Sequence, residues 1–393
     1  MNWTDHFAKR TQNMKPSTIR EILKLTQRSE VISFAGGLPA PHLFPVNELQ
    51  QAAEKVLSER GAEALQYSTT EGYLPLREWV ASRFEGMSTE NVQVVSGSQQ
   101  GLDLVGKCFL NPGDKVVVSA PTYMGALRAF DPYEPEYLTV ECDDEGMLPE
   151  ALEQALTRNP KLLYVIPNFD NPTGITMSLA RRKRLLELAE RFDVPIYEDD
   201  PYGELRFEGE ELPRLVDLAP ERVIYAGTFS KIVVPGFRTA WLVAPADALL
   251  PIGRAKQAAD LHTSTYTQMI AYEVLSSGFL DAQVGRVREY YKKQRDLMLA
   301  ALDAHFPDDL TWTRPKGGMF LWVTLPDGVD ATELAYEAVE QNVAYVPGEA
   351  FFADGTGKNT LRLSYSVATP EQIEAGMERL GQVFKKHLTA ATV

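Results

Sequence analysis

The chain has 393 residues, more than one domain usually spans, so we expect at least two structural units. Its composition, with 44% hydrophobic and 24% charged residues, is that of a globular protein and excludes collagen-like and broadly disordered classes. The 54 acidic and 39 basic residues give a net charge of −15. This charge argues against nucleic acid as a partner, because phosphate binding needs a clustered basic face.

The sequence also argues against membrane, secreted and metal-binding proteins. No apolar stretch approaches the roughly 20 residues needed to span a bilayer, and residues 1–20 are polar, unlike a secretory signal. Cys108 and Cys142 are too few for a disulfide framework and favour a cytoplasmic protein. The five histidines are scattered without metal-ligand spacing, so we expect no metal site.

The N-terminal region predicts one helix and one turn. Thr18, followed three residues later by Glu21, forms a capping box that marks a helix start. A turn is expected at Gly36 and Gly37, because adjacent glycines are strong turn formers. We assign residues 1–45 to an N-terminal arm that also forms part of a smaller domain.

Residues 46–285 alternate short apolar strands with segments of helix length, and we assign them to a large domain. One helix is expected at 179–192, where Leu185, Leu188 and Phe192 share a face. Near-continuously apolar strands separated by helices predict an α/β architecture, a mostly parallel sheet with helices on both faces. Such sheets bind ligands at the carboxyl ends of their strands. The expected strands are 92–96, 115–120, 162–167, 194–198, 223–227 and 239–244.

Residues 286–393 have a different pattern, in which fewer strands are set against longer helices. The expected strands are 319–325 and 360–367, and the expected helices are 331–341 and 370–387. This arrangement predicts a smaller α+β domain at the C-terminus.

A lysine and several phosphate-binding side chains follow the expected strand 223–227. Taken alone, Lys231 has the pattern of an ordinary solvated loop cation. In a rigid and largely desolvated position, its amine would instead act as a nucleophile. Hydroxyl groups at Thr228 and Ser230 and the guanidinium of Arg238 would then be donors to a phosphate.

A second candidate phosphate site lies where a strand ends and a helix begins. Gly97, Ser98 and Gln99 stand at this point, and free N–H groups at a helix start bind anions. The same residues also fit a simple turn and cap. The pattern matches neither the dinucleotide-binding nor the P-loop motif, so nucleotide binding loses its best support.

Two further strand ends carry polar side chains. Asn171 follows one strand, and Asp199 with Tyr202 follows the next. Asn-Pro and Asp-Pro are common turn starters, and either pair alone would indicate only a loop. Together with Lys231, however, these groups fall at the carboxyl ends of successive strands, where one pocket can collect them.

The series of motifs resembles the fold-type I pyridoxal phosphate aminotransferases over residues 15–388. The resemblance rests on Asn171-Pro-Thr-Gly, Asp199-Asp-Pro-Tyr, Ser230-Lys231 with Arg238, and Arg362. Further motifs resemble the 2-aminoadipate and kynurenine aminotransferase group, which includes bacterial enzymes of lysine biosynthesis. These motifs are Ser33-Phe-Ala-Gly-Gly-Leu-Pro, Gln66-Tyr-Ser, Glu71-Gly-Tyr, Gly97-Ser-Gln-Gln and Lys316-Gly-Gly-Met.

The resemblance implies pyridoxal 5′-phosphate as cofactor, bound by the large domain, and a role for each residue. Lys231 would hold the cofactor as an aldimine and later move a proton at the substrate Cα. Asp199 would pair with the pyridine nitrogen and keep it protonated. Asn171 and Tyr202 would bind the ring 3′-oxygen, and Tyr123 would stack on the ring. The implied phosphate ligands are Ser98, Gln99, Thr228, Ser230 and Arg238.

The resemblance also implies a homodimer with shared active sites, because Tyr67 of such enzymes reaches the phosphate of the neighbouring subunit. Arg362 would clamp the substrate α-carboxylate, and the alternation of its strand places it on one face with Ser364 and Ser366. Arg20 would bind a distal carboxylate, although locally it fits an exposed helix cation. The implied substrate-binding set is Arg20, Gly36, Gly37, Tyr67, Asn171 and Arg362.

The implied reaction moves an amino group between an L-amino acid and a 2-oxo acid such as 2-oxoglutarate by a ping-pong mechanism. The candidate donors are 2-aminoadipate and glutamate, with leucine and aromatic amino acids as further candidates. An aminotransferase specialised for aromatic or branched-chain substrates is an alternative.

Other classes of protein compete with this interpretation. A pyridoxal phosphate lyase or decarboxylase would share Lys231 and Asp199 but would return no amino group to a 2-oxo acid. A transcriptional regulator with an aminotransferase-like domain needs a DNA-binding module, and only 15 residues precede Pro16. The intact set of site residues argues against a catalytically silent binding protein.

Overall fold

An eight-stranded sheet forms the centre of the protein in a computed structural model, which describes residues 1–14 and 30–391. The strands β8, β7, β6, β3 and β4 run parallel to one another, whereas β9 is antiparallel to both of its neighbours and β5 is antiparallel to β4. The order across the sheet is β2 (Val92–Val95), β9 (Ala240–Val243), β8 (Val223–Thr228), β7 (Ile196–Asp199), β6 (Leu162–Val165), β3 (Lys115–Ala120), β4 (Glu136–Asp143) and β5 (Gly146–Met147).

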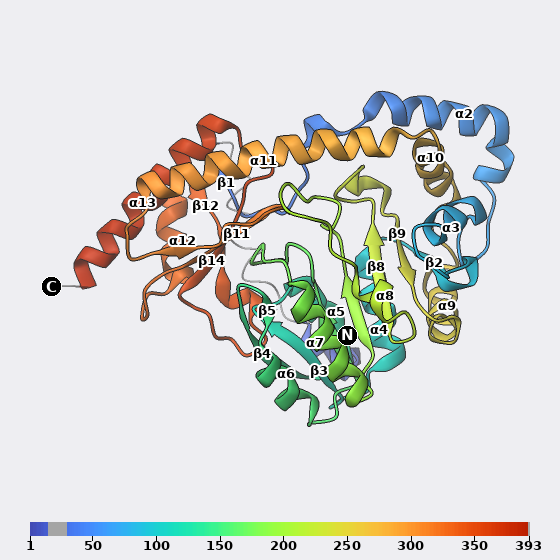
Figure 1. The fold of residues 1–393 in the computed structure, drawn as a ribbon, viewed down its shortest axis with the longest axis horizontal. Helices are drawn as coiled ribbons and strands as arrows, with labels where there is room; N and C mark the ends of the chain where they lie inside the picture. Colours follow the sequence, from blue (N-terminus) through green and yellow to red (C-terminus); the bar gives the residue numbers. More distant parts are fainter. Residues whose placement is uncertain (15–29, 392–393) are drawn as a thin grey trace.

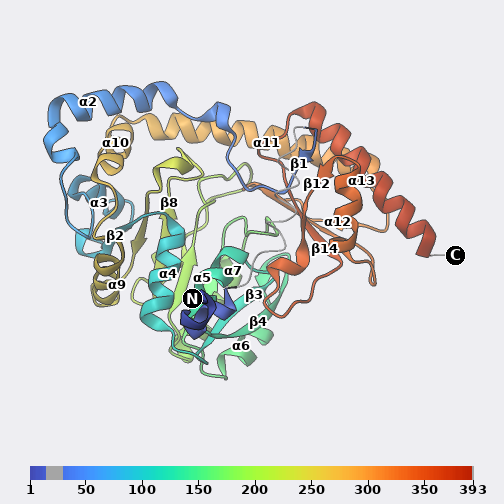
Figure 2. The same cartoon turned by 180° about the vertical axis from the view of Figure 1, so that it is seen from behind.

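Helices cover both faces of this sheet, and its central strands are therefore buried on both sides. One face carries α6 (Pro149–Leu156), α7 (Leu179–Arg191) and α8 (Leu215–Leu218), as Figure 1 shows. The other face carries α4 (Ser98–Phe109), α5 (Met124–Phe130) and α9 (Ala246–Asp260), seen in Figure 2. The carboxyl ends of β6, β7 and β8 are therefore held between two helix layers.

A smaller antiparallel sheet lies beside the large one, with strand order β10-β11-β14-β13 (Figure 1). A two-stranded parallel sheet, β1 with β12, joins the N-terminal and C-terminal parts of the chain. These strands are β1 (Ile32–Ser33), β10 (Thr311–Trp312), β11 (Phe320–Thr324), β12 (Val343–Ala344), β13 (Val346–Pro347) and β14 (Thr360–Ser364). The remaining helices are α2 (Val46–Ala64), α3 (Leu74–Ala81), α10 (Thr265–Ser276), α11 (Phe279–His305), α12 (Ala331–Glu340) and α13 (Pro370–Ala391).

The expected α/β class is confirmed, and each strand expected from the sequence forms within a few residues of its predicted bounds. The strand β4 was not expected, because its alternating buried and exposed residues differ from the continuous apolar runs of the central strands. The division of the chain into 1–45, 46–285 and 286–393 stays a prediction. Residue 285 lies inside α11, so a boundary there would fall within one continuous helix.

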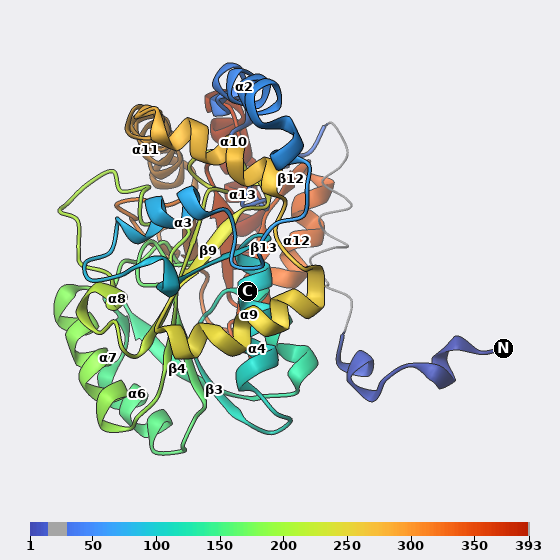
Figure 3. The ribbon, with the colours of Figure 1, turned by 90° about the vertical axis from the view of Figure 1, so that its right-hand side faces the viewer.

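The N-terminal segment of residues 1–14 forms two short 3-10 helices, Trp3–His6 and Lys9–Asn13 (Figure 3). The second of them contacts the 3-10 helix Asp131–Tyr133. The expected capping box at Thr18 and Glu21 lies outside the described residues. Within residues 1–14 and 30–391, no helix is long and apolar enough to cross a membrane. In the same residues, no cluster of three or more His, Cys, Asp or Glu side chains is arranged to hold a metal ion.

Candidate active site

A pocket of about 460 Å³ opens at the carboxyl ends of β6, β7 and β8, where the small sheet meets the large one. It is lined by all the sequence-predicted site residues except Arg20, Gly36 and Tyr67. A cleft of about 720 Å³ beside Arg314 and Lys316 is larger but contains none of the predicted site residues. The residues that line the smaller pocket therefore identify it as the candidate active site.

Lys231 lies in the turn that follows β8, and its Nζ donates a hydrogen bond of 2.8 Å to the carbonyl oxygen of Gly37. Burial, together with the nearby cations Arg362 and Arg238 and against the opposing charge of Asp199, lowers the pKa of Lys231 to about 8. A substantial fraction of the amine is therefore neutral near pH 8, which is the form that attacks a carbonyl carbon.

Asp199 is the last residue of β7 and is only 3% exposed. The Tyr164 hydroxyl donates a hydrogen bond of 2.9 Å to its Oδ2 atom. Burial raises the pKa of Asp199 to about 7 despite this hydrogen bond. In the part of the chain that the structure describes, no lysine or arginine forms an ion pair with Asp199. A buried carboxylate without an ion-pair partner is stabilised when a cationic group binds beside it in the pocket.

Arg362 of β14 brings the small sheet into the pocket. Its Nη1 donates to Asn171 Oδ1 and its Nη2 to the carbonyl oxygen of Ala35, each at 2.7 Å. The guanidinium carbon lies over the rings of Phe320 and Phe351, 4.2 and 4.9 Å from their centroids. Burial lowers the pKa of Arg362 to about 10, so the group remains a cation at neutral pH. These contacts fix a fork of donors suited to a carboxylate.

Asn171 and Tyr202 form a second pair of polar groups next to Arg362. The side chain of Asn171 donates from Nδ2 to the Tyr202 hydroxyl at 3.4 Å. Both side chains are almost completely buried, and the Lys231 Nζ atom lies 6.0 Å from the centroid of the Tyr202 ring. An amide and a phenol are thus fixed beside the lysine, where they can bind a ring oxygen.

A cluster of anion-binding donors also lines the pocket. Ser98 and Gln99 are the first residues of α4, whose free N–H groups carry partial positive charge. The Thr228 hydroxyl donates to Ser230 Oγ at 3.0 Å, and it accepts a hydrogen bond from Ser230 N at 3.1 Å. The side chain of Arg238 completes the cluster.

Two glycines make room for this arrangement. Gly97 has φ +87°, and a Cβ atom there would collide with Nη2 of Arg238. Gly125 lies against the ring of Tyr123, where a Cβ atom would collide with Cζ. Side chains at these positions would displace the guanidinium and the ring, so the placement of both groups depends on the absence of a Cβ atom.

Three predicted site residues are not placed in the pocket. Tyr67 is 79% exposed and lies beside the ring of His262, with 5.9 Å between the ring centroids. Gly36 is partly buried but does not line the pocket, whereas its neighbour Gly37 does. Arg20 lies outside the described residues.

The sequence alone did not single out Tyr164, Phe320 or Phe351. Tyr164 stands opposite Tyr197 in the register of β6 and β7, and Asp199 lies two residues further along the same face. This neighbour relation becomes visible only when the two strands are known to pair. The Arg362 contacts with the two phenylalanines likewise depend on the packing of the small sheet.

The sequence pattern of the family "Aminotransferase class I and II" matches residues 30–380. The chain belongs to this family. Over 390 residues this aminotransferase is 49% identical to the 2-aminoadipate transaminase of Thermus thermophilus, with 98% of each chain covered. It is 46% identical over 400 residues to the aromatic-amino-acid aminotransferase 1 of Thermococcus litoralis, with 99% of this chain and 96% of the relative covered.

A solved structure confirms the fold of the aminotransferase. The crystal structure of LysN, the α-aminoadipate aminotransferase of Thermus thermophilus complexed with N-(5′-phosphopyridoxyl)-L-leucine, matches with a TM-score of 0.94. The two chains are 47% identical, and the match covers 99% of this chain and 100% of LysN. The expected enzyme class, fold-type I architecture and pyridoxal phosphate cofactor are confirmed.

The residues of the pocket fit this cofactor chemically. The donor cluster around Ser98, Ser230 and Arg238 suits a phosphate group. Because Gly97 has no Cβ atom, the guanidinium of Arg238 can occupy its place in this cluster. The buried carboxylate of Asp199, which lacks a cationic side-chain partner among the described residues, suits a protonated pyridine nitrogen. The aminotransferase thus offers one group for each charged part of pyridoxal phosphate.

Proposed function

We propose that this aminotransferase moves an amino group between an L-amino acid and a 2-oxo acid such as 2-oxoglutarate. The proposed donors are 2-aminoadipate and glutamate, with leucine and aromatic amino acids as further candidates. The meeting of Lys231, Asp199 and Arg362 in one pocket carries the proposal, because it combines a nucleophilic amine, a buried acid and a carboxylate clamp. The printed names of the two relatives support the choice of donors.

Each pocket residue has a proposed task in the reaction. Bound pyridoxal phosphate supplies an aldehyde that takes up amino groups and a ring that withdraws electrons from the substrate Cα. Lys231, with its lowered pKa, would act as the nucleophile that attaches to the cofactor and as the base that moves a proton at the substrate Cα. Asp199 would accept a hydrogen bond from the ring nitrogen and hold a proton there.

The clamp residues would fix the substrate relative to Lys231. Arg362 would bind the α-carboxylate with its two terminal nitrogens, which now contact Asn171 and Ala35. Asn171 and Tyr202 would bind the ring 3′-oxygen, and Tyr123 would pack on the ring face. Fixed donors of this kind lower the barrier because they need no reorganisation during the reaction.

The test of this proposal is a spectroscopic half-reaction. L-2-Aminoadipate, glutamate, leucine or kynurenine is added separately to the purified enzyme, and 2-oxoglutarate is added afterwards. We expect the visible cofactor band to bleach with a donor and to return with the oxo acid. If the donor is consumed but 2-oxoglutarate does not restore the band, the enzyme is a lyase or decarboxylase and the proposal fails.

We predict that Arg20→Ala selectively weakens dicarboxylic donors. The guanidinium would bind the distal carboxylate, so kcat/KM for 2-aminoadipate should fall about tenfold or more, whereas leucine should change little. Steady-state kinetics with both donors measure the difference. The control is Arg10→Ala in the N-terminal segment, where an exposed cation is removed. Equal losses for both donors would show that Arg20 does not select the substrate.

We also propose a homodimer in which Tyr67 reaches the cofactor phosphate of the neighbouring subunit. Its exposure supports this, since a 79% exposed tyrosine makes few contacts within its own chain. Tyr67→Phe should increase the rate of cofactor loss several-fold, as one hydrogen bond to a phosphate disappears. Dialysis of the holoenzyme measures this rate, and light scattering checks for a mass of twice 43.8 kDa.

The control, Tyr336→Phe, removes a hydroxyl from a tyrosine of α12 that is also exposed. Unchanged cofactor retention in the Tyr67 variant would refute its proposed contact.

A cytoplasmic location stays a prediction, based on the two cysteines, which form no disulfide.

A further inference from the structure

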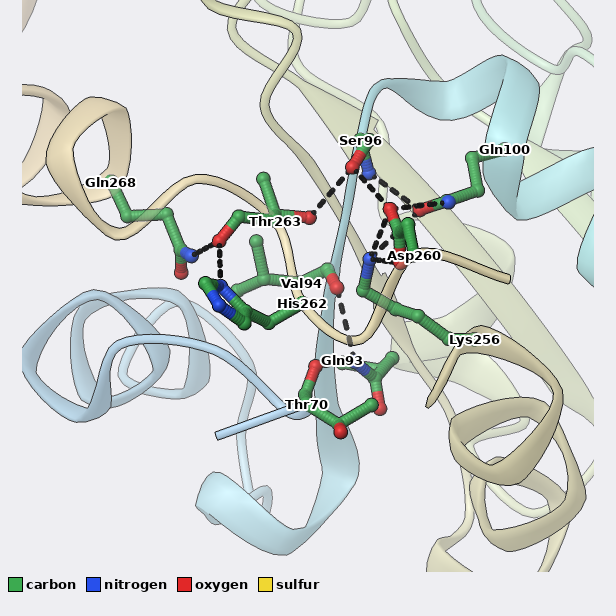
Figure 4. A network of polar contacts seen from close by, with 10 residues as sticks. All are labelled: Thr70, Gln93, Val94, Ser96, Gln100, Lys256, Asp260, His262, Thr263 and Gln268. Carbon is green, nitrogen blue, oxygen red and sulfur yellow. Dashed lines mark hydrogen bonds and ion pairs between the residues drawn. The ribbon is translucent and has the colours of Figure 1, made fainter. Parts of the chain in front are cut away.

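A network of polar contacts includes Ser96 and Gln100, which flank Gly97, Ser98 and Gln99 in the sequence (Figure 4). At its centre is Asp260, the last residue of α9. Its Oδ2 atom accepts hydrogen bonds from Ser96 Oγ at 2.8 Å and from Gln100 Nε2 at 2.7 Å. The Asp260 carboxylate thus binds Ser96 and Gln100, which lie on either side of Ser98 and Gln99 in the sequence.

The network contains an ion pair between a buried lysine and a partly exposed carboxylate. The side chain of Lys256, one helical turn before Asp260, is 0% exposed, and its Nζ lies 2.9 Å from Asp260 Oδ1. The same Nζ donates to Gln100 Oε1 at 3.0 Å, and that oxygen also accepts from the backbone N of Ser96 at 2.8 Å. Burial alone would raise the pKa of Asp260, but hydrogen bonds from Lys256, Gln100 and Ser96 hold it below its ordinary value. The carboxylate is therefore charged at neutral pH.

The backbone has unusual conformations at Gly97 and at Leu261, which follow Ser96 and Asp260 of the network. Gly97 has φ +87° and ψ 156°, a region that is accessible almost only to glycine. Leu261, directly after Asp260, has φ 65° and ψ −64°, which is the geometry of a rare and strained γ-turn. Such conformations persist where surrounding contacts determine them, and the contacts of Asp260 join the two strained points.

The network also extends away from the pocket. Ser96 Oγ and Thr263 Oγ1 lie 3.0 Å apart, and the carbonyl oxygen of Thr263 accepts a hydrogen bond from Gln268 Nε2 at 2.8 Å. His262 Nδ1 lies 2.8 Å from the same carbonyl oxygen, and His262 Nε2 accepts from the backbone N of Ser68 at 3.3 Å. The segment after Asp260 is thereby fixed to the body of the protein.

We propose that Asp260 is a positioning residue for cofactor binding, whose carboxylate holds the turn 96–100 in the shape that presents Ser98 and Gln99 to the phosphate. Asp260 does not line the pocket and acts only through the turn. Lys256 pairs with the carboxylate and keeps it in place. This inference rests on the proposed role of Ser98 and Gln99 as phosphate ligands.

The test compares pyridoxal phosphate with pyridoxal, which lacks the phosphate group. In Asp260→Asn, one of the two acceptor oxygens becomes an NH2 group that cannot accept from Lys256, and the negative charge that pairs with this lysine is lost, so the turn loses part of its support. We expect the dissociation constant of pyridoxal phosphate, measured by absorbance on the full-length protein, to rise about tenfold or more. The dissociation constant of pyridoxal should remain as in the unchanged protein.

Two further variants make the test sharper. Asp247→Asn is the control, because it removes a negative charge near the other end of α9, where the carboxylate accepts a hydrogen bond from Ala248 N. It should leave both dissociation constants unchanged. Ser96→Ala keeps the ion pair with Lys256 and removes only the hydroxyl, so it tests the same idea if Asp260→Asn does not fold. It should weaken pyridoxal phosphate binding selectively, by a smaller factor.

The possible outcomes separate the inference from the proposed function. If Asp260→Asn and Ser96→Ala bind pyridoxal phosphate as tightly as the unchanged protein, the inference is wrong. If either variant weakens pyridoxal and pyridoxal phosphate equally, the role of Asp260 is general structural support, and the inference is again wrong. If the unchanged protein binds both compounds equally, the phosphate site itself is refuted, and the proposed function fails with it.

Discussion

Replacing Lys231 with alanine is expected to abolish transamination, with kcat at least about 10⁴-fold lower. The variant lacks the only amine that the pocket offers among the described residues, so neither covalent attachment of the cofactor nor proton movement at the substrate Cα can occur. Steady-state assays measure the loss of turnover. Protein mass after borohydride reduction measures covalent attachment, which should disappear. The fold should persist, because the lysine side chain donates one hydrogen bond, to Gly37.

The matched control is Lys183→Ala, which removes an exposed lysine from α7. It should retain both turnover and covalent cofactor. Measurable transamination by the Lys231 variant would contradict the assignment of the nucleophile. Loss of the cooperative thermal transition would instead indicate that the variant is unfolded, and the mass measurement would then be made at lower temperature.

Replacing Asp199 with asparagine is expected to reduce kcat about 10²- to 10³-fold, because a fixed electrostatic partner of the reacting ring is lost. An amide retains the size of the side chain but cannot hold a proton on the ring nitrogen. The substitution also removes a buried charge, so the thermal stability of the cofactor-free protein should not fall. Stopped-flow measurement of the half-reaction with glutamate separates the chemical step from substrate binding.

Asp193→Asn serves as the control for Asp199→Asn, since it changes an exposed carboxylate before the opposite end of β7. Asp193 has φ 52°, a conformation that asparagine also tolerates. The control should keep normal rates. A half-reaction rate in the Asp199 variant equal to that of the control would mean that the carboxylate has no part in the chemistry.

The strand ends were predictable from the sequence because parallel strands impose a simple rule. Buried strands of this class are apolar along most of their length, so the polar segments that follow each run stand out, and these segments contain Asn171, Asp199 and Lys231. The roles of these residues remain predictions, but their gathering in one pocket follows directly from the architecture.

Features that depend on pairing between distant segments were not predictable in this way. The hydrogen bond from Tyr164 to Asp199 requires the register of β6 with β7, and the sequence does not specify which strands are neighbours. The contact between Asp260 and the turn at Ser96 joins residues 164 positions apart. Lys256 has the pattern of a surface helix cation, and only the packing shows that it is buried.

The two halves of the pocket differ in how much of the chain they require. The donor cluster around Ser98, Thr228 and Arg238 comes entirely from segments next to the eight-stranded sheet. The clamp at Arg362 instead depends on contacts with Asn171 and Ala35, which lie 191 and 327 positions away in the sequence. A local opening that detaches the small sheet would therefore destroy the clamp and leave the donor cluster intact. Amide hydrogen exchange should detect such an opening as faster exchange in β14 than in β7. Under mild denaturant, the enzyme would then lose affinity for amino acids before it releases its cofactor.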